Sequence, residues 1–128
     1  MAKGVLVDTC IWIDFFKDTP SVAKKLQRLI EKDTVYTAGI ILFEIFQGVK
    51  SEKEKVVLEE VFKSISYLEM TSRSWLNAAG LSRDLKQKGL TLPPSDILLA
   101  QLAIENSLEI FTIDDHFKRI PGLALVKN

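Results

Sequence analysis

Four carboxylates occupy positions in this sequence from which acidic side chains could act together. Asp8 directly follows the apolar run Val5–Val7, and Asp114 follows a second apolar stretch. Glu44 interrupts an otherwise apolar segment, and Asp96 stands immediately before another. Oxygen ligands of this kind suit Mg²⁺ or Mn²⁺ better than zinc, and such an ion can activate water for attack on a phosphodiester. We therefore predict a site for metal-assisted hydrolysis, provided that the fold brings the four acids together.

Each of these acids also has an explanation that involves no chemistry. Asp8 and Asp114 could accept backbone hydrogen bonds at strand ends or helix starts, and Asp96 could be stabilised by a helix dipole. A buried Glu44 needs a compensating partner, because an isolated buried carboxylate is costly. A salt bridge to lysine or arginine is the structural alternative for this residue. The prediction therefore depends on the joint placement of the four acids.

Apolar patterns predict the elements that must position these acids. Short apolar runs indicate strands at 5–7, 34–38, 65–70, 109–112 and 123–126. Helical spacing indicates helices at 9–17, from Pro20 onward, 39–49, 51–62, 71–88 and 95–106, with a turn or short helix at 114–119. We expect Thr9 and Ser95 to cap two of these helices.

The alternation of strands and helices predicts an α/β fold. Parallel neighbouring strands need crossover connections, so we expect a three-layer α/β/α sandwich around a central parallel sheet. Ligands bind such sheets beyond the carboxyl ends of the strands. Asp8 and Asp114 lie at such ends, whereas only the fold could bring Glu44 and Asp96 to the same edge.

Size and charge narrow the functional class. The chain has 128 residues, which suits one domain, and it balances 17 basic against 17 acidic residues. Without a general positive field, any binding of nucleic acid must come from local basic patches. Cys10 is the single cysteine and cannot form an internal disulfide, and one cysteine with one histidine does not make a typical structural zinc site. No apolar run is long enough for a membrane span and no export signal is visible, so we expect a cytoplasmic protein.

Four segments, at 5–14, 43–48, 92–100 and 110–117, carry a family resemblance. With these segments in this order and spacing, the chain resembles a PIN domain, most closely the small toxin ribonucleases of the VapC type. The resemblance implies a single PIN-like nuclease domain over residues 1–128. It also implies a divalent-metal-dependent endoribonuclease that uses Mg²⁺, with Mn²⁺ able to substitute. The residues that match the family's catalytic and metal-binding quartet are Asp8, Glu44, Asp96 and Asp114.

The resemblance also implies two hydroxyl groups beside the acidic pocket, and the sequence differs from the family pattern at two positions near it. Thr112, and less closely Thr9, match hydroxyl positions beside the acidic pocket, and we include Thr112 among the catalytic residues. Cys10 stands where a serine is frequent, and His116 stands where the family often has a second aspartate. We interpret Asp115 as a solvated neighbour of the site. We interpret His116 as a surface histidine, with an approach to substrate as the alternative.

The resemblance further implies RNA as substrate, an inhibitory antitoxin protein and a homodimer, and no membrane partner. In this family a segment of the antitoxin fills the groove near the acidic pocket. Trp12, Phe15 and Phe16 are candidates for exposed apolar contacts, with core packing as the alternative. Positive charge for RNA phosphates could come from three clusters, which could equally be solvated helix faces: Lys50, Lys53 and Lys55; Arg83, Lys86 and Lys88; and Lys118 with Arg119.

Two other functions are compatible with an acidic pocket in a chain of this length. A non-catalytic PIN-like module would use the same surface to bind a protein, and the presence of all four acids disfavours it. A phosphoacceptor signalling domain would need an acidic pair after the first strand. Here Asp8 is followed by Thr9 and Cys10, so we rank this function lowest.

Overall fold

A single parallel sheet forms the centre of the structure, which is a computed structural model that describes residues 3–17 and 19–127. Within these residues five strands pair in the order β3-β2-β1-β4-β5. Their bounds are β1 Val5–Val7, β2 Val35–Ala38, β3 Ser66–Leu68, β4 Glu109–Phe111 and β5 Ala124–Leu125. The all-apolar β1 lies in the middle and is buried throughout, because both of its faces are covered. The predicted strands are confirmed: β1 has the predicted bounds, and the other four strands are shorter than predicted by one or two residues at an end.

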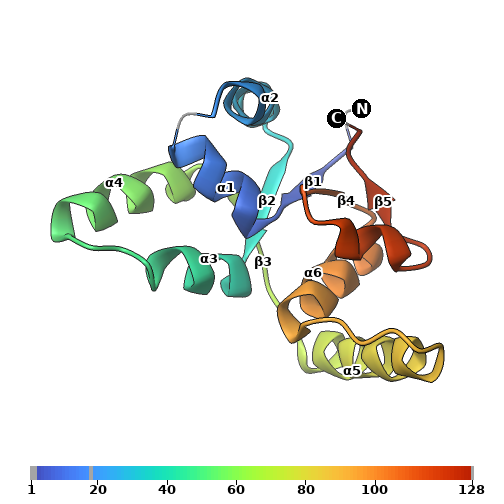
Figure 1. Ribbon diagram of the computed structural model, residues 1–128. Helices are drawn as coiled ribbons and strands as arrows, with labels where there is room; N and C mark the ends of the chain where they lie inside the picture. Colours follow the sequence, from blue (N-terminus) through green and yellow to red (C-terminus); the bar gives the residue numbers. More distant parts are fainter. Residues whose placement is uncertain (1–2, 18, 128) are drawn as a thin grey trace.

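Helices cover both faces of this sheet. They are α1 Thr9–Phe16, α2 Pro20–Glu31, α3 Gly39–Phe46, α4 Glu52–Lys63, α5 Ser72–Gln87 and α6 Pro94–Glu105, followed by the 3₁₀ helix η1 Asp115–Arg119. In Figure 1, α1 to α4 lie on one side of the strands, and α5 and α6 lie on the other. Right-handed crossovers explain this division. The chain moves outward from β1 to β3 with helices on one face, then returns to β4 through helices on the opposite face. The predicted three-layer α/β/α sandwich is confirmed.

The aromatic cluster on α1 belongs largely to the core. Trp12 is fully buried, and its ring centroid lies 4.6 Å from that of Phe62 on α4. Phe15 is half-buried against the core, whereas Phe16 stays 37% exposed. The prediction of an exposed contact surface is therefore wrong for Trp12, because α1 packs between α2 and α3 and turns this side chain inward.

Two predicted caps differ from the structure. Helix α1 is capped by Asp8, whose Oδ1 accepts a 2.8 Å hydrogen bond from the backbone N of Thr9. Helix α6 starts at Pro94 with Pro93 at the N-cap, so Ser95 lies inside the first turn. Proline suits this first position because the missing N–H would have no partner within the helix. Among the described residues, no helix has the length and apolar character needed to cross a membrane.

Candidate active site

The neighbouring ends of β1 and β4 place Asp8 beside Thr112. The two strands are in register with Val7 opposite Phe111, and the backbone N of Asp8 donates to the carbonyl of Phe111 at 3.0 Å. The residues that follow the two strands are therefore adjacent. The hydroxyl of Thr112 donates a 2.7 Å hydrogen bond to Oδ2 of Asp8, and each residue is only 8% exposed. One carboxylate is thus held firmly at the carboxyl edge of the sheet.

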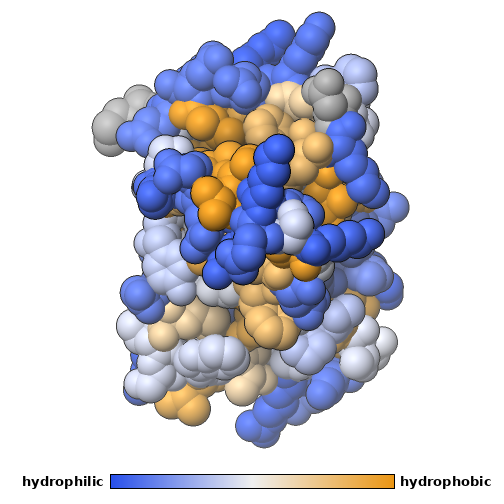
Figure 2. Space-filling model, turned by 90° about the vertical axis from the view of Figure 1, so that its left-hand side faces the viewer, coloured by the Kyte–Doolittle hydropathy of each residue, from blue (hydrophilic) through white to orange (hydrophobic). Residues whose placement is uncertain are grey.

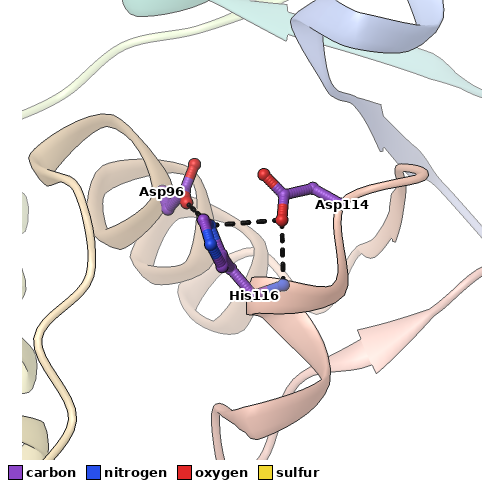
Figure 3. A group of neighbouring side chains, drawn as sticks. All are labelled: Asp96, Asp114 and His116. Atoms are coloured by element: carbon purple, nitrogen blue, oxygen red, sulfur yellow. Dashed lines mark hydrogen bonds and ion pairs between the residues drawn. The ribbon is translucent and has the colours of Figure 1, made fainter.

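A second group combines Asp96, Asp114 and His116, which point toward one another in Figure 3. Asp96 lies in the first turn of α6, Asp114 precedes η1, and His116 belongs to η1. The imidazole Nδ1 lies 2.9 Å from Oδ2 of Asp96 and 3.1 Å from Oδ1 of Asp114. One donor atom from each residue lies within 4.8 Å of the others, so this group could hold a metal ion.

Glu44 is half-buried on α3 and takes its hydrogen bond from a hydroxyl. Oγ1 of Thr9 donates to Oε1 of Glu44 at 2.8 Å. No lysine or arginine within residues 3–17 and 19–127 forms an ion pair with Glu44. The salt-bridge alternative is therefore not what the structure shows, and the carboxylate remains available to a cation.

A continuous path of hydrogen bonds connects the four predicted acids. Its members, in order, are Glu44, Thr9, Asp8, Thr112, Asp114, His116 and Asp96. Within this path the hydroxyl of Thr112 also accepts from the backbone N of Asp114 at 3.0 Å. The compact group contains Asp96, Asp114 and His116, and Asp8 is near enough for its charge to act on Asp96. Glu44 lies further along the path, where Thr9 connects it to Asp8.

Burial and mutual repulsion shift the ionisation of this site. Burial raises the pKa of the Asp96 carboxyl, the charges of Asp114 and Asp8 add to the rise, and the hydrogen bond with His116 opposes it. The same hydrogen bond raises the pKa of His116, as does the charge of Asp114. Burial raises the pKa of the Cys10 thiol, and the negative charge of Asp8 acts in the same direction. The site therefore favours bound positive charge, in the form of protons or of a cation.

The contacts of His116 were missed in the sequence interpretation. Its side chain is 48% exposed, as expected of a surface histidine, yet its ring contacts two carboxylates. Its position two residues after Asp114 was the available signal, because an aspartate side chain often accepts a hydrogen bond from the backbone two residues on, which keeps the two residues close together. Asp115 points the other way, with its side chain 84% exposed and paired to Lys118 at 2.9 Å.

Cys10 lies at the edge of the same path of hydrogen bonds. Its half-buried Sγ is 3.4 Å from Oδ2 of Asp8 and 3.6 Å from Oγ1 of Thr112. The thiol therefore occupies a position in which it can donate weakly to the carboxylate that Thr112 already holds.

An apolar groove opens beside Glu44, between α1, α3 and α4. It has a volume of about 710 Å³. Its wall is apolar and consists of Ile13, Phe16, Ile45, Val57 and Leu58. Its rim is charged and consists of Lys17, Glu44, Lys53 and Glu54. Figure 2 views the molecule from the side of α3 and α4 and shows exposed hydrophobic residues among hydrophilic ones. The groove thus joins one predicted acid to a surface suited to an amphipathic ligand.

Comparisons with known proteins agree with this architecture. Residues 5–123 match the PIN domain family. Ribonuclease VapC2 of Rickettsia felis is 29% identical over 126 residues, covering 94% of each chain. Ribonuclease VapC11 of Mycobacterium tuberculosis is 28% identical over 125 residues, covering 94% of this chain and 93% of the relative.

Solved structures share the fold at lower identity. The structure of VapBC2 from Rickettsia felis bound to a promoter DNA fragment superposes with a TM-score of 0.80 and 24% identity, covering 95% of this chain and 96% of that one. DNA-bound VapBC from Salmonella typhimurium gives a TM-score of 0.81 with 21% identity, covering 98% of both chains. With its parallel sheet, its helix layers and a family match over nearly its whole length, this chain belongs to the PIN domain family.

Proposed function

We propose that this chain is a divalent-metal-dependent endoribonuclease and the toxin of a toxin–antitoxin pair, with residues 1–128 forming a single nuclease domain. The observation that carries the proposal is the path of hydrogen bonds that runs through Asp8, Glu44, Asp96 and Asp114, with Asp96 and Asp114 close enough together to share a cation with His116. Relatives that match over nearly the full chain and are named VapC ribonucleases support the assignment.

We propose these four acids as metal ligands and Mg²⁺ as an ion that supports cleavage, with Mn²⁺ able to take its place. The donor set fits a divalent cation, because burial raises the pKa of Asp96 and the negative charges of Asp114 and Asp8 raise it further, so the site favours a bound positive charge. A bound divalent ion would supply activation of water and stabilisation of charge on the phosphate.

The protein's own groups orient this chemistry. The hydroxyl of Thr112 fixes one oxygen of Asp8, and the backbone N of Thr9 fixes the other. The hydroxyl of Thr9 holds Glu44 in the same manner. Because these partners are themselves held by β1, β4 and α1, the carboxylates face the pocket with little rotational freedom, and Thr112 acts as a positioning residue.

The groove beside Glu44 supports the proposed partners. Lys17 and Lys53 line it together with apolar side chains, so it offers contacts to an RNA phosphate at its rim and to an antitoxin segment along its apolar wall. Structures of VapBC toxin–antitoxin complexes with the same fold support the antitoxin. We also propose a homodimer and a cytoplasmic location, where RNA is present and the Cys10 thiol stays free.

Cleavage of a labelled single-stranded RNA by the purified, antitoxin-free chain tests the proposal. Cleavage should require a divalent ion and fall by at least a hundredfold in Asp8→Asn, whose side chain can still cap α1. Asp115→Asn is the matched control, because this neighbouring carboxylate is 84% exposed and pairs with Lys118. Equal cleavage by parent and Asp8→Asn would overturn the assignment. Binding of the antitoxin without any cleavage by the parent would favour the non-catalytic module.

A further inference from the structure

We propose that His116 is a nitrogen ligand of the metal centre, so that this site prefers Mn²⁺ over Mg²⁺; the inference rests on the proposed metal-dependent function. The acids alone would form an all-oxygen site. The structure adds one imidazole nitrogen that faces two of them, Asp96 and Asp114.

The spacing of the donor atoms already resembles that of neighbouring ligands. Nδ1 of His116 lies 2.9 Å from Oδ2 of Asp96 and 3.1 Å from Oδ1 of Asp114. Adjacent ligands of an octahedral ion with bonds of about 2.1 Å are roughly 3.0 Å apart. A cation can therefore bind between these three atoms without a large movement of any side chain.

Local structure holds the imidazole in this position. The backbone N of His116 donates to Oδ1 of Asp114 at 2.9 Å, which connects the histidine to one of the acids. The next residue, Phe117, is 1% exposed and anchors η1 in the core. Metal binding at Nδ1 would replace the hydrogen that this atom shares with the carboxylates, and the remaining ring hydrogen would then be on Nε2.

A nitrogen ligand changes which ion the site favours. Mg²⁺ takes oxygen ligands and gives up its waters reluctantly, whereas first-row transition ions accept imidazole readily. Histidine also brings no negative charge, so it lowers the electrostatic attraction that Mg²⁺ needs. Mn²⁺ combines acceptance of carboxylate oxygen with acceptance of imidazole, and we expect it to bind more tightly than Mg²⁺.

The single histidine of this chain makes a direct test possible. The untagged protein is loaded with Mn²⁺ and examined by pulsed electron paramagnetic resonance, with and without ¹⁵N-histidine labelling. Modulation by nitrogen that changes on labelling can come only from His116. His116→Asp, which makes the site all-oxygen, should abolish this modulation, and Asp115→Asn should retain it.

Calorimetry with Mn²⁺ and Mg²⁺ supplies the second measurement. In the parent, Mn²⁺ should have a lower dissociation constant than Mg²⁺. In His116→Asp this preference for Mn²⁺ should fall by roughly tenfold or more, since even the loss of a residue that only supports a metal ligand typically costs that much in metal affinity. Bound Mn²⁺ without a labelled-nitrogen signal would overturn the role of His116 while leaving the proposed nuclease intact. Failure of both ions to bind would overturn the metal-dependent function and this inference with it.

Discussion

The hydroxyl of Thr112 donates a 2.7 Å hydrogen bond to Oδ2 of Asp8, across a sequence separation of 104 residues. Oγ1 of Thr112 also accepts a hydrogen bond from the backbone N of Asp114 at 3.0 Å. One hydroxyl therefore holds an acid at the end of β1 and shapes the loop that carries another acid. This double role makes Thr112 the junction between the two halves of the site.

Thr112→Val should impair both stability and cleavage. The substitution leaves a buried carboxylate oxygen and a backbone N–H without this partner, at a cost of about 1–3 kcal/mol in the free energy of unfolding. RNA cleavage should fall further than the loss of folded protein explains, because Asp8 loses its orientation. Urea denaturation and cleavage rates measure the two effects. Thr112→Ser keeps the hydroxyl and should restore both; a serine variant as impaired as the valine variant would argue against the hydrogen bond.

Thr9→Val should reduce cleavage by about tenfold, since loss of a partner that orients a metal ligand typically costs that much or more. Its Oγ1 is the hydrogen-bond donor to Glu44, so the variant leaves that carboxylate free to rotate. The backbone N of residue 9 still reaches Asp8, and α1 should keep its cap. Cleavage rates and circular dichroism check the prediction. Unchanged cleavage in Thr9→Val would show that Glu44 needs no such support.

The ionisation of His116 should depend on Asp96. The hydrogen bond between them raises the pKa of the imidazole above its ordinary value of 6.5. Protonated His116 therefore stabilises the fold below about pH 6.5, and this contribution is lost as the pH rises through the folded-state pKa. An NMR titration of the single histidine should show a lower pKa in Asp96→Asn than in the parent. Identical titration curves would contradict the pairing.

Thr37→Val should stabilise the protein. Thr37 on β2 is 2% exposed, and its Oγ1 has no hydrogen-bond partner in the part of the chain that the structure describes. Valine has the same shape and removes a buried hydroxyl, so the free energy of unfolding should rise by about 1 kcal/mol.

Thr34→Val is the matched comparison for this stability measurement. The hydroxyl of Thr34 is also buried, but it donates to the carbonyl of Leu29 at 3.0 Å. This second variant should lose about 1 kcal/mol, and urea denaturation of both proteins measures the difference. If both variants shifted stability in the same direction, hydrogen bonding would not be the cause.

Local patterns in the sequence were sufficient to predict the strands and helices and the positions of Asp8 and Asp114 after their strands. Val5–Val7 is apolar at every position, and such a run is typical of a strand buried between two helix layers. Asp8 directly follows it, so the acid's place at the carboxyl edge depends only on the strand ending there. The alternation of such strands with helices also predicted the layers, because parallel strands require crossovers.

Contacts between distant segments could not be predicted in this way. That Trp12 faces inward depends on how α1 packs between α2 and α3. That Glu44 takes a hydroxyl partner and no basic residue depends on where α3 meets the start of α1.

The ends of the strands are therefore determined by the sequence, and the partners of the acids by the tertiary structure. Hydropathy and turn preferences act over a few residues, so they determine where Asp8 and Asp114 follow their strands. The register of β1 against β4 pairs Asp8 with Thr112, and the packing of α6 against η1 places His116 between Asp96 and Asp114. Such side-chain contacts depend on ångström-scale positions that only the packed core sets.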